Sequence, residues 1–242
     1  MLDILFGPPT EIFSALLEAE EKKFKTSSEK AMLYAAGFGF LNLVFCGFAD
    51  WYILGQFSQN SISLFLLVES SLYLLFSLGY FKGRSEEILS KTDVIDLPPG
   101  SRFLLVLRTN VRHPITRMLL ATLTLFWIVL LWGSPSTLIV TLTFSFFLFL
   151  NIATLSSILF IEMSKAALPA QSIAVIVLFA VFVLLVGSIV FQFGTMLTAI
   201  PFVSWTALGI VAFVNGGLFW IIPLALNVVV FVSSYIVAMN YL

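Results

Sequence analysis

TLIVTLTFSFFLFLNIATLSSILFI, residues 137–161, contains no charged side chain. A helix that crosses a bilayer needs about 20 consecutive apolar residues, and this run provides them. Lipid is a better solvent for such a run than the core of a soluble domain. The stretch therefore predicts a transmembrane helix.

The composition of the whole chain also favours a membrane protein. Its residues are 60% hydrophobic and 10% charged, and its mean hydropathy is +1.07. A soluble domain carries about 25% charged residues, so this chain could not cover its apolar surface in water. Long apolar runs predict six transmembrane helices, at residues 31–54, 62–81, 118–132, 137–161, 171–193 and 218–241. We expect an all-α membrane protein in which residues 31–242 form a six-helix transmembrane domain.

Two further segments are expected to lie along or within one face of the membrane. Residues 1–30 place apolar side chains at helical spacing opposite charged ones. This pattern predicts a cytoplasmic amphipathic helix at the interface, and a solvated helix packed on the protein's own loops is the alternative. The apolar residues 197–214 are interrupted by Pro201, so 194–217 is predicted to be an outer re-entrant segment before the last helix. If 197–214 crosses instead, the C-terminus lies outside.

The basic residues set the predicted orientation. They lie before the first span, in the connection at residues 82–117, and at Lys165. If the chain crosses the membrane at each of the six predicted spans, all of these residues lie on one side. That side is cytoplasmic by the positive-inside rule. The tryptophans are predicted to mark the outer ends of spans, as in an aromatic belt: Trp51, Trp127, Trp132, Trp205 and Trp220. We expect an integral protein of the cytoplasmic (plasma) membrane with both termini in the cytoplasm.

Residues for enzyme chemistry are sparse. The chain has one histidine, His113, and one cysteine, Cys46, so paired-histidine and cysteine-based metal sites are not expected. The sequences GxSxG and GxxxxGK[ST] are absent, which argues against a hydrolase serine and a phosphate-binding loop. We expect no catalytic residue, no metal site, no cofactor in this chain and no nucleic-acid partner.

A few polar and small residues within the spans are functional candidates. Glu69 is the costly one, because an ionisable group at that depth costs about 2.5–3.5 kcal/mol. It is predicted to line a water-filled path or the bundle interior, or to be protonated; Asn151 is a second path candidate, although joining helices is its more common role. Four small residues suggest a helix-packing or dimer seam, with packing inside one subunit as the alternative: Ala31, Ala35, Gly39 and Gly47.

The cytoplasmic connection at residues 82–117 is too long for a simple turn. Residues 85–97 and 101–112 each predict a short helix, separated by Pro98, Pro99 and Gly100. A mixed-charge helix with apolar anchors below the membrane suits docking on a soluble partner. The alternative is a solvated loop.

The order of these elements resembles an ABC-2 type permease, the membrane subunit of an ABC exporter. EEILSKTDVIDLPPGSRF (86–103) is similar to the coupling region of that family, and PFVSWTALGIVAF (201–213) to its re-entrant outer segment. The resemblance implies export of a lipid, peptide, glycan or drug-like substrate by a dimer with a second permease copy or a homologous permease. It also implies separate ABC ATPase subunits that bind the ATP and magnesium. The docking residues would be Glu86, Glu87, Ile88, Leu89, Asp93, Asp96 and Leu97.

A second family remains as the alternative. The proline and phenylalanine residues ahead of the amphipathic segment also resemble the Yip family, whose members do not transport and instead organise membranes. A copurifying ATPase would favour the permease, whereas binding only to lipid or trafficking proteins would favour the Yip-like function.

Overall fold

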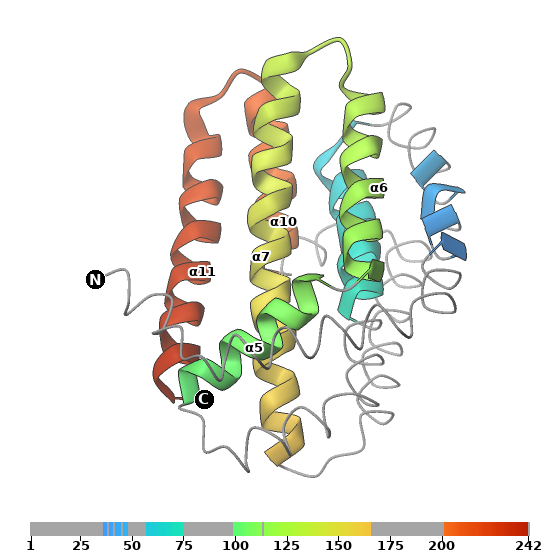
Figure 1. Cartoon of the computed structure of the whole chain (residues 1–242). Helices are drawn as coiled ribbons and strands as arrows, with labels where there is room; N and C mark the ends of the chain where they lie inside the picture. Colours follow the sequence, from blue (N-terminus) through green and yellow to red (C-terminus); the bar gives the residue numbers. More distant parts are fainter. Residues whose placement is uncertain are drawn as a thin grey trace, which may run out of the picture.

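The computed structural model describes residues 57–74, 99–112, 114–165 and 201–241, with positions 36, 37, 39, 40, 42–44, 46 and 47. Every regular element in these residues is a helix (Figure 1). The labelled helices are α5 (Pro99–Arg112), α6 (Pro114–Leu130), α7 (Pro135–Lys165), α10 (Val203–Val214), the short 3-10 helix η1 (Leu218–Trp220) and α11 (Ile221–Tyr241). Residues 59–74 and the described positions between 36 and 47 are also helical.

Several predicted segments lie outside the described residues. They are residues 1–30, part of the first span, the end of the second span, residues 82–98, the fifth span at 171–193 and the first part of 194–217. The all-helical fold class is confirmed for the described part of the chain. The total of six spans stays a prediction.

Two described helices are long and apolar enough to cross a membrane. They cover Pro135–Glu162 and Leu218–Asn240, at the fourth and sixth predicted spans. The pair Gly100–Val111 and Thr116–Leu130 is a third candidate, bent by 56° at its break. The bend falls next to Pro114, which lacks a backbone N–H and disfavours a helical residue before it. The helix that contains the third predicted span, α6, therefore begins at Pro114, four residues before residue 118.

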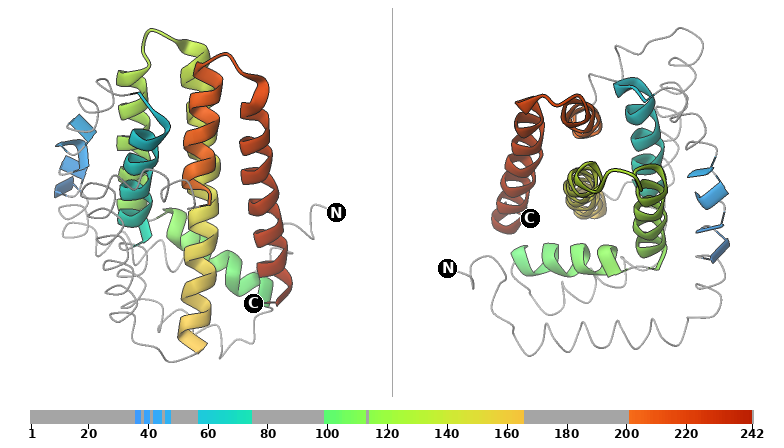
Figure 2. Two further views of the ribbon diagram at one scale, coloured as in Figure 1. Left: turned by 180° about the vertical axis from the view of Figure 1, so that it is seen from behind. Right: turned by 90° about the horizontal axis from the view of Figure 1, so that it is seen from above.

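The helix α7 stands in the middle of the described bundle. Seen from above in Figure 2, α5, α6, α10, α11 and residues 59–74 surround it. It contains 31 residues, which corresponds to about 46 Å and exceeds a hydrocarbon core of about 30 Å. Pro135 is its first residue, where a missing N–H costs nothing, and Ser134 Oγ lies 2.8 Å from Thr137 Oγ1 at this end.

The helix α5 crosses α7 and α11 and contacts both of them, in the lower half of the view in Figure 1. Phe103, Leu104, Leu105 and Val106 are all buried there. A Cβ added to Gly100 would lie 2.7 Å from the backbone oxygen of Met239, so glycine allows the start of α5 to approach the end of α11. The predicted helix at 101–112 is confirmed, and this half of the connection is packed helix rather than solvated loop.

The helix α10 begins and ends where the sequence predicted breaks. Pro201 and Phe202 form a turn with Phe202 at a φ of 67°, and the chain leaves the helix at Asn215 and Gly216. With 12 residues, α10 is about 18 Å long, too short to cross a bilayer alone. Beyond Gly217 the chain turns into η1 and α11, beside α10 (Figure 2).

Trp127 differs from the prediction of an outer aromatic belt. Its side chain is fully buried and lies edge-on to Phe65, at 5.9 Å between ring centroids, and to Phe126, at 4.8 Å. The ring thus joins α6 to residues 59–74. Trp132 fits the prediction better, because it is 79% exposed in the turn between α6 and α7.

Candidate functional site

Glu69 lies on the helix of residues 59–74 with 6% of its surface exposed. Asn42 Nδ2 donates to its Oε2 at 3.4 Å, and Cys46 Sγ donates to its Oε1 at 3.6 Å. The same Asn42 nitrogen lies 2.6 Å from Thr122 Oγ1 on α6. Both carboxyl oxygens therefore face the first helix, where they accept one long N–H contact from Asn42 and one S–H contact of ordinary length from Cys46.

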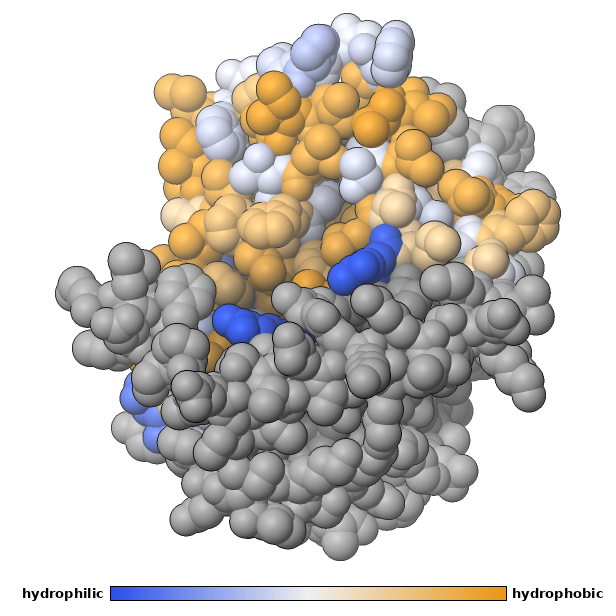
Figure 3. Space-filling model, viewed as in Figure 1, coloured by the Kyte–Doolittle hydropathy of each residue, from blue (hydrophilic) through white to orange (hydrophobic). Residues whose placement is uncertain are grey.

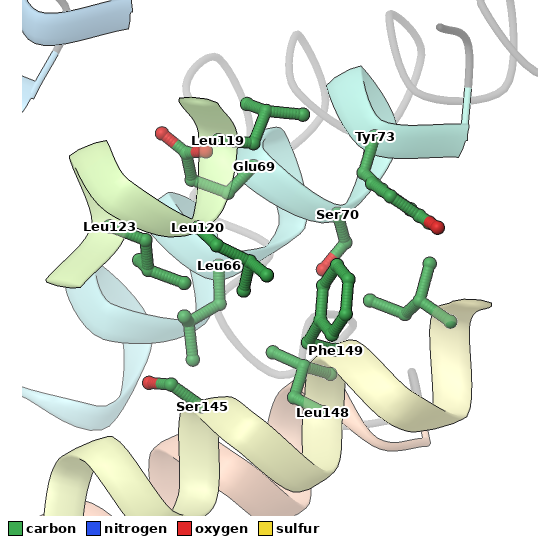
Figure 4. A pocket seen from close by; sticks show the side chains of 11 residues that line it. Leu66, Glu69, Ser70, Tyr73, Leu119, Leu120, Leu123, Ser145, Leu148 and Phe149 are labelled. Atoms are coloured by element: carbon green, nitrogen blue, oxygen red, sulfur yellow. The ribbon is translucent and has the colours of Figure 1, made fainter. Parts of the chain in front are cut away.

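A small cavity lies beside Glu69 (Figure 4). Its volume is about 30 Å³, which is room for one or two water molecules. Ser145 Oγ on α7 lines it and is buried without a hydrogen-bond partner. The lining residues are Leu66, Glu69, Ser70, Tyr73, Leu119, Leu120, Leu123, Ser145, Leu148, Phe149 and Ile152. The cavity is mostly apolar, with a few oxygen atoms that could bind water.

A chain of side-chain hydrogen bonds begins at the Tyr73 edge of this cavity. Tyr73 OH donates to Asn110 Oδ1 at 2.6 Å, and Asn110 Nδ2 donates to Ser156 Oγ at 2.7 Å. Asn110 belongs to α5 and Ser156 to α7, and all three side chains are buried. These bonds tie α5 to two neighbouring helices, and we call them the α5 clamp.

Asn151, the second predicted path residue, lies in a different place from Glu69. Its Nδ2 donates to the backbone oxygen of Asn227 on α11 at 3.0 Å and to Phe147 O at 2.9 Å. It does not line the Glu69 cavity. The geometry of Asn151 is that of a side chain joining α7 to α11, and the two predicted path residues do not form one site.

The predicted small-residue seam is only partly described. Gly39 is buried, and a Cβ added to it would lie 3.5 Å from Met118 Sδ on α6. Gly47 is exposed, with nothing within 4 Å of an added Cβ. Ala31 and Ala35 lie outside the described residues. Gly39 therefore packs inside this chain, and Gly47 points away from it.

The predicted docking residues Glu86 to Leu97 lie outside the described part of the chain, which resumes at Pro99. Within the described residues, no group of three or more histidine, cysteine or acidic side chains could hold a metal ion.

Sequence reasoning missed Asn42, Thr122, Tyr73 and Asn110. Asn42 could have been noticed, because it is a polar residue inside an apolar span. The sequence alone does not show, however, that Asn42 faces Glu69. Asn110 was hidden in a connection already expected to be polar.

These features define a class, an all-helical protein with at least two helices that could cross a membrane and with one buried carboxyl group, that of Glu69. Comparison with known proteins adds no family to this class, because no family model, curated protein or solved structure matches the chain.

Proposed function

We propose that this chain is the membrane-spanning subunit of an ATP-driven exporter of the ABC-2 type. A separate ATPase would dock on residues 85–97 and hydrolyse ATP with its own magnesium. The exported substrate would be a lipid, peptide, glycan or drug-like molecule. The observation that carries the proposal is the α5 clamp.

The clamp connects the predicted docking segment to the bundle. Pro99, the first residue of α5, follows Leu97 after one residue. The helix is buried against α7 and α11, and Asn110 hydrogen-bonds to Tyr73 and Ser156. A force on residues 85–97 would therefore move α5 as a rigid rod and be passed to its neighbours, because packed helices shift between discrete arrangements rather than deforming continuously.

The remaining parts of the exporter follow from this arrangement. Glu69 stays a candidate for lining the path, since its side chain is among those that line the cavity, although its carboxyl group points toward the first helix (Figure 4). Asn151 would act by holding α7 to α11. A second permease copy would pack on the exposed side of the first helix, which presents Phe40, Val44 and Gly47.

Copurification tests the proposal. The full chain would be isolated in mild detergent from its native membrane, with and without the combined substitutions Glu86→Lys, Glu87→Lys, Asp93→Lys and Asp96→Lys. We expect an ATPase subunit to copurify with the unchanged chain and to be lost, by roughly tenfold or more, from the charge-reversed chain. Reversed charges in a polar docking surface replace attraction with repulsion.

The control is Arg117→Glu, which reverses an exposed charge near the start of α6 and should leave ATPase recovery unchanged. Equal recovery from all three forms would count against the docking segment. Recovery of only lipid or trafficking proteins would favour the Yip-like, membrane-organising alternative.

A further inference from the structure

We propose that α5 and the first turn of α6 bind the headgroups of anionic phospholipids through Arg102, Arg108 and Arg117. The site lies at the membrane surface on the α5 side of the bundle, which is cytoplasmic in the predicted orientation. This inference goes beyond the exporter proposal and does not depend on it. It requires only that α7 and α11 cross the bilayer.

The first argument is the depth of α5 relative to α7. Trp132 is exposed in the turn before α7 and marks one membrane surface, where tryptophans are enriched. α5 packs against α7 at Ser156, Phe160 and Ile161, which lie about 32–39 Å along the helix from Pro135. A hydrocarbon core is about 30 Å thick, and the headgroups extend the membrane to about 40–45 Å. α5 therefore lies among the headgroups of the opposite surface.

The helix α11 gives the same depth independently. Its Ala238 belongs to the buried cluster that contains Phe103 and Val106 of α5. Leu218 is exposed at the other end of this candidate span, and Ala238 lies about 30 Å further along the chain. In Figure 1 the turn between α6 and α7 and the turn between α10 and α11 are both at the top, with α5 well below them. Two helices thus place α5 at the edge of the hydrocarbon core.

The second argument is the charge at this level. α5 and α6 contain arginines but no aspartate or glutamate. Arg117 is exposed, and Arg102 and Arg108 are partly exposed. Side chains lean toward the N-terminal end of their helix, which brings the guanidinium group of Arg117 toward the membrane surface. A guanidinium group has five N–H donors, so an arginine that also contacts the protein can still donate to a phosphate.

The third argument is the apolar surface beside these arginines. On the face shown in Figure 3, hydrophobic side chains cover much of the upper part, and strongly hydrophilic residues lie at the lower edge of that surface. On α6, the exposed side chains of Met118, Leu125 and Val129 lie on one face by helical spacing. They extend over about 16 Å, close to one half of a hydrocarbon core of about 30 Å. A phospholipid fits this surface with its phosphate at Arg117 and an acyl chain along the apolar face.

The charge of the surface selects the kind of lipid. Basic side chains near a membrane surface attract anionic lipids. A zwitterionic lipid also carries a cationic choline or ethanolamine group, and neither α5 nor α6 offers a carboxylate to pair with it. We therefore expect phosphatidylglycerol to bind more tightly than phosphatidylcholine.

Electron paramagnetic resonance of spin-labelled lipids tests the proposal, because it separates lipids held at the protein from those in the free bilayer. The full chain would be reconstituted in phosphatidylcholine, with spin-labelled phosphatidylglycerol or phosphatidylcholine of the same acyl chains as probes. We expect phosphatidylglycerol to associate roughly fivefold more strongly, the effect of about one arginine at the surface. High salt should reduce this preference, since exposed charges are screened.

Two matched variants assign the preference to these side chains. The combined substitutions Arg102→Gln, Arg108→Gln and Arg117→Gln should remove it. The combined substitutions Arg102→Lys, Arg108→Lys and Arg117→Lys should keep most of it, because lysine preserves the positive charge.

Equal association of the two lipids with the unchanged chain would overturn the proposal, and so would a preference that high salt does not reduce. Both measurements need no variant. Full preference in a folded glutamine variant would overturn it as well, because other basic residues would then hold the lipid. None of these outcomes depends on whether an ATPase copurifies, so this proposal and the exporter proposal can fail separately.

Discussion

The helix α7 meets α10 and α11 on one side through close packing, and on another it meets residues 59–74 and α6 across a cavity. On the packed side, Gly209 lies against the ring of Phe144, and Asn151 joins α7 to α11. On the cavity side, Ser145 Oγ has no partner, and Glu69 accepts from Asn42 Nδ2 at 3.4 Å and from Cys46 Sγ at 3.6 Å. Buried oxygens without a partner occur on both sides, since Thr206 Oγ1 on α10 and Asn227 Oδ1 on α11 also have none. The two sides of α7 therefore differ in the cavity and in the buried carboxyl group near it.

This contrast separates structural polar residues from functional ones. An amide that donates to two backbone oxygens, as Asn151 does, needs no further explanation. A carboxyl group with 6% exposure beside a cavity costs stability, and such a cost is usually kept where a site needs it. We therefore expect substitutions on the packed side to change stability, and substitution of Glu69 to change it little.

The largest effect is expected from Gly209→Ala. The added Cβ would overlap the Phe144 ring, which is fully buried and has little room to move. Overpacking lowers stability by about 1–3 kcal/mol. The better helix propensity of alanine raises stability by about 0.5–1 kcal/mol. A net loss of about 1–2 kcal/mol should appear in the free energy of unfolding, measured by SDS titration in mixed micelles.

Gly37→Ala is the matched control for that substitution. It makes the same change at a helical position where nothing lies within 4 Å of an added Cβ. Only the propensity gain remains, so stability should stay equal or rise by up to about 1 kcal/mol. If both alanine variants behave alike, α10 does not pack on α7 at Phe144.

The positions of the described spans could be predicted from sequence because apolar runs and prolines carry that information locally. The runs at 137–161 and 218–241 became α7 and α11, and Pro114 and Pro201 mark helix starts. The end of a helix was less predictable. The uncharged run underestimated α7, which continues past residue 161 to Lys165, since polar residues near a membrane surface can stay helical.

The sequence could not predict which face of each helix is turned toward which neighbouring helix. The polar side chains of α7, such as Thr141, Ser145 and Asn151, are buried in the bundle, but the sequence does not indicate which of them face α10 and which face the cavity. The Gly39 and Gly47 pair shows the same difficulty, because positions eight apart are rotated by about 80° on an α-helix. Only the packing shows that one glycine is buried and the other exposed.

A smaller effect is expected from Asn151→Leu. The substitution removes the donor to Asn227 O, and side-chain hydrogen bonds between membrane helices contribute about 0.6 kcal/mol on average and up to about 1.7 kcal/mol. Loss of about 0.5–1.5 kcal/mol in the same SDS titration is the expected outcome. Asn240→Leu serves as control, because Asn240 is exposed and donates only to Ile236 O of its own helix. Equal losses in both variants would remove Asn151 from the α7–α11 contact.

The smallest effect is expected from Glu69→Gln. If Glu69 is neutral in this conformation, glutamine preserves its size, keeps an acceptor for Asn42 and Cys46, and supplies N–H donors in place of the carboxyl O–H. The free energy of unfolding should then change by less than about 0.5 kcal/mol, since no charge and few hydrogen bonds are lost. An ionised carboxylate held by its surroundings would behave differently, because its donors would lose a charged partner worth about 1.5–3 kcal/mol. A loss of more than about 1 kcal/mol in the Glu69→Gln titration would therefore show that the protein stabilises the charge, and the cavity side of α7 would then be as well satisfied as the packed side.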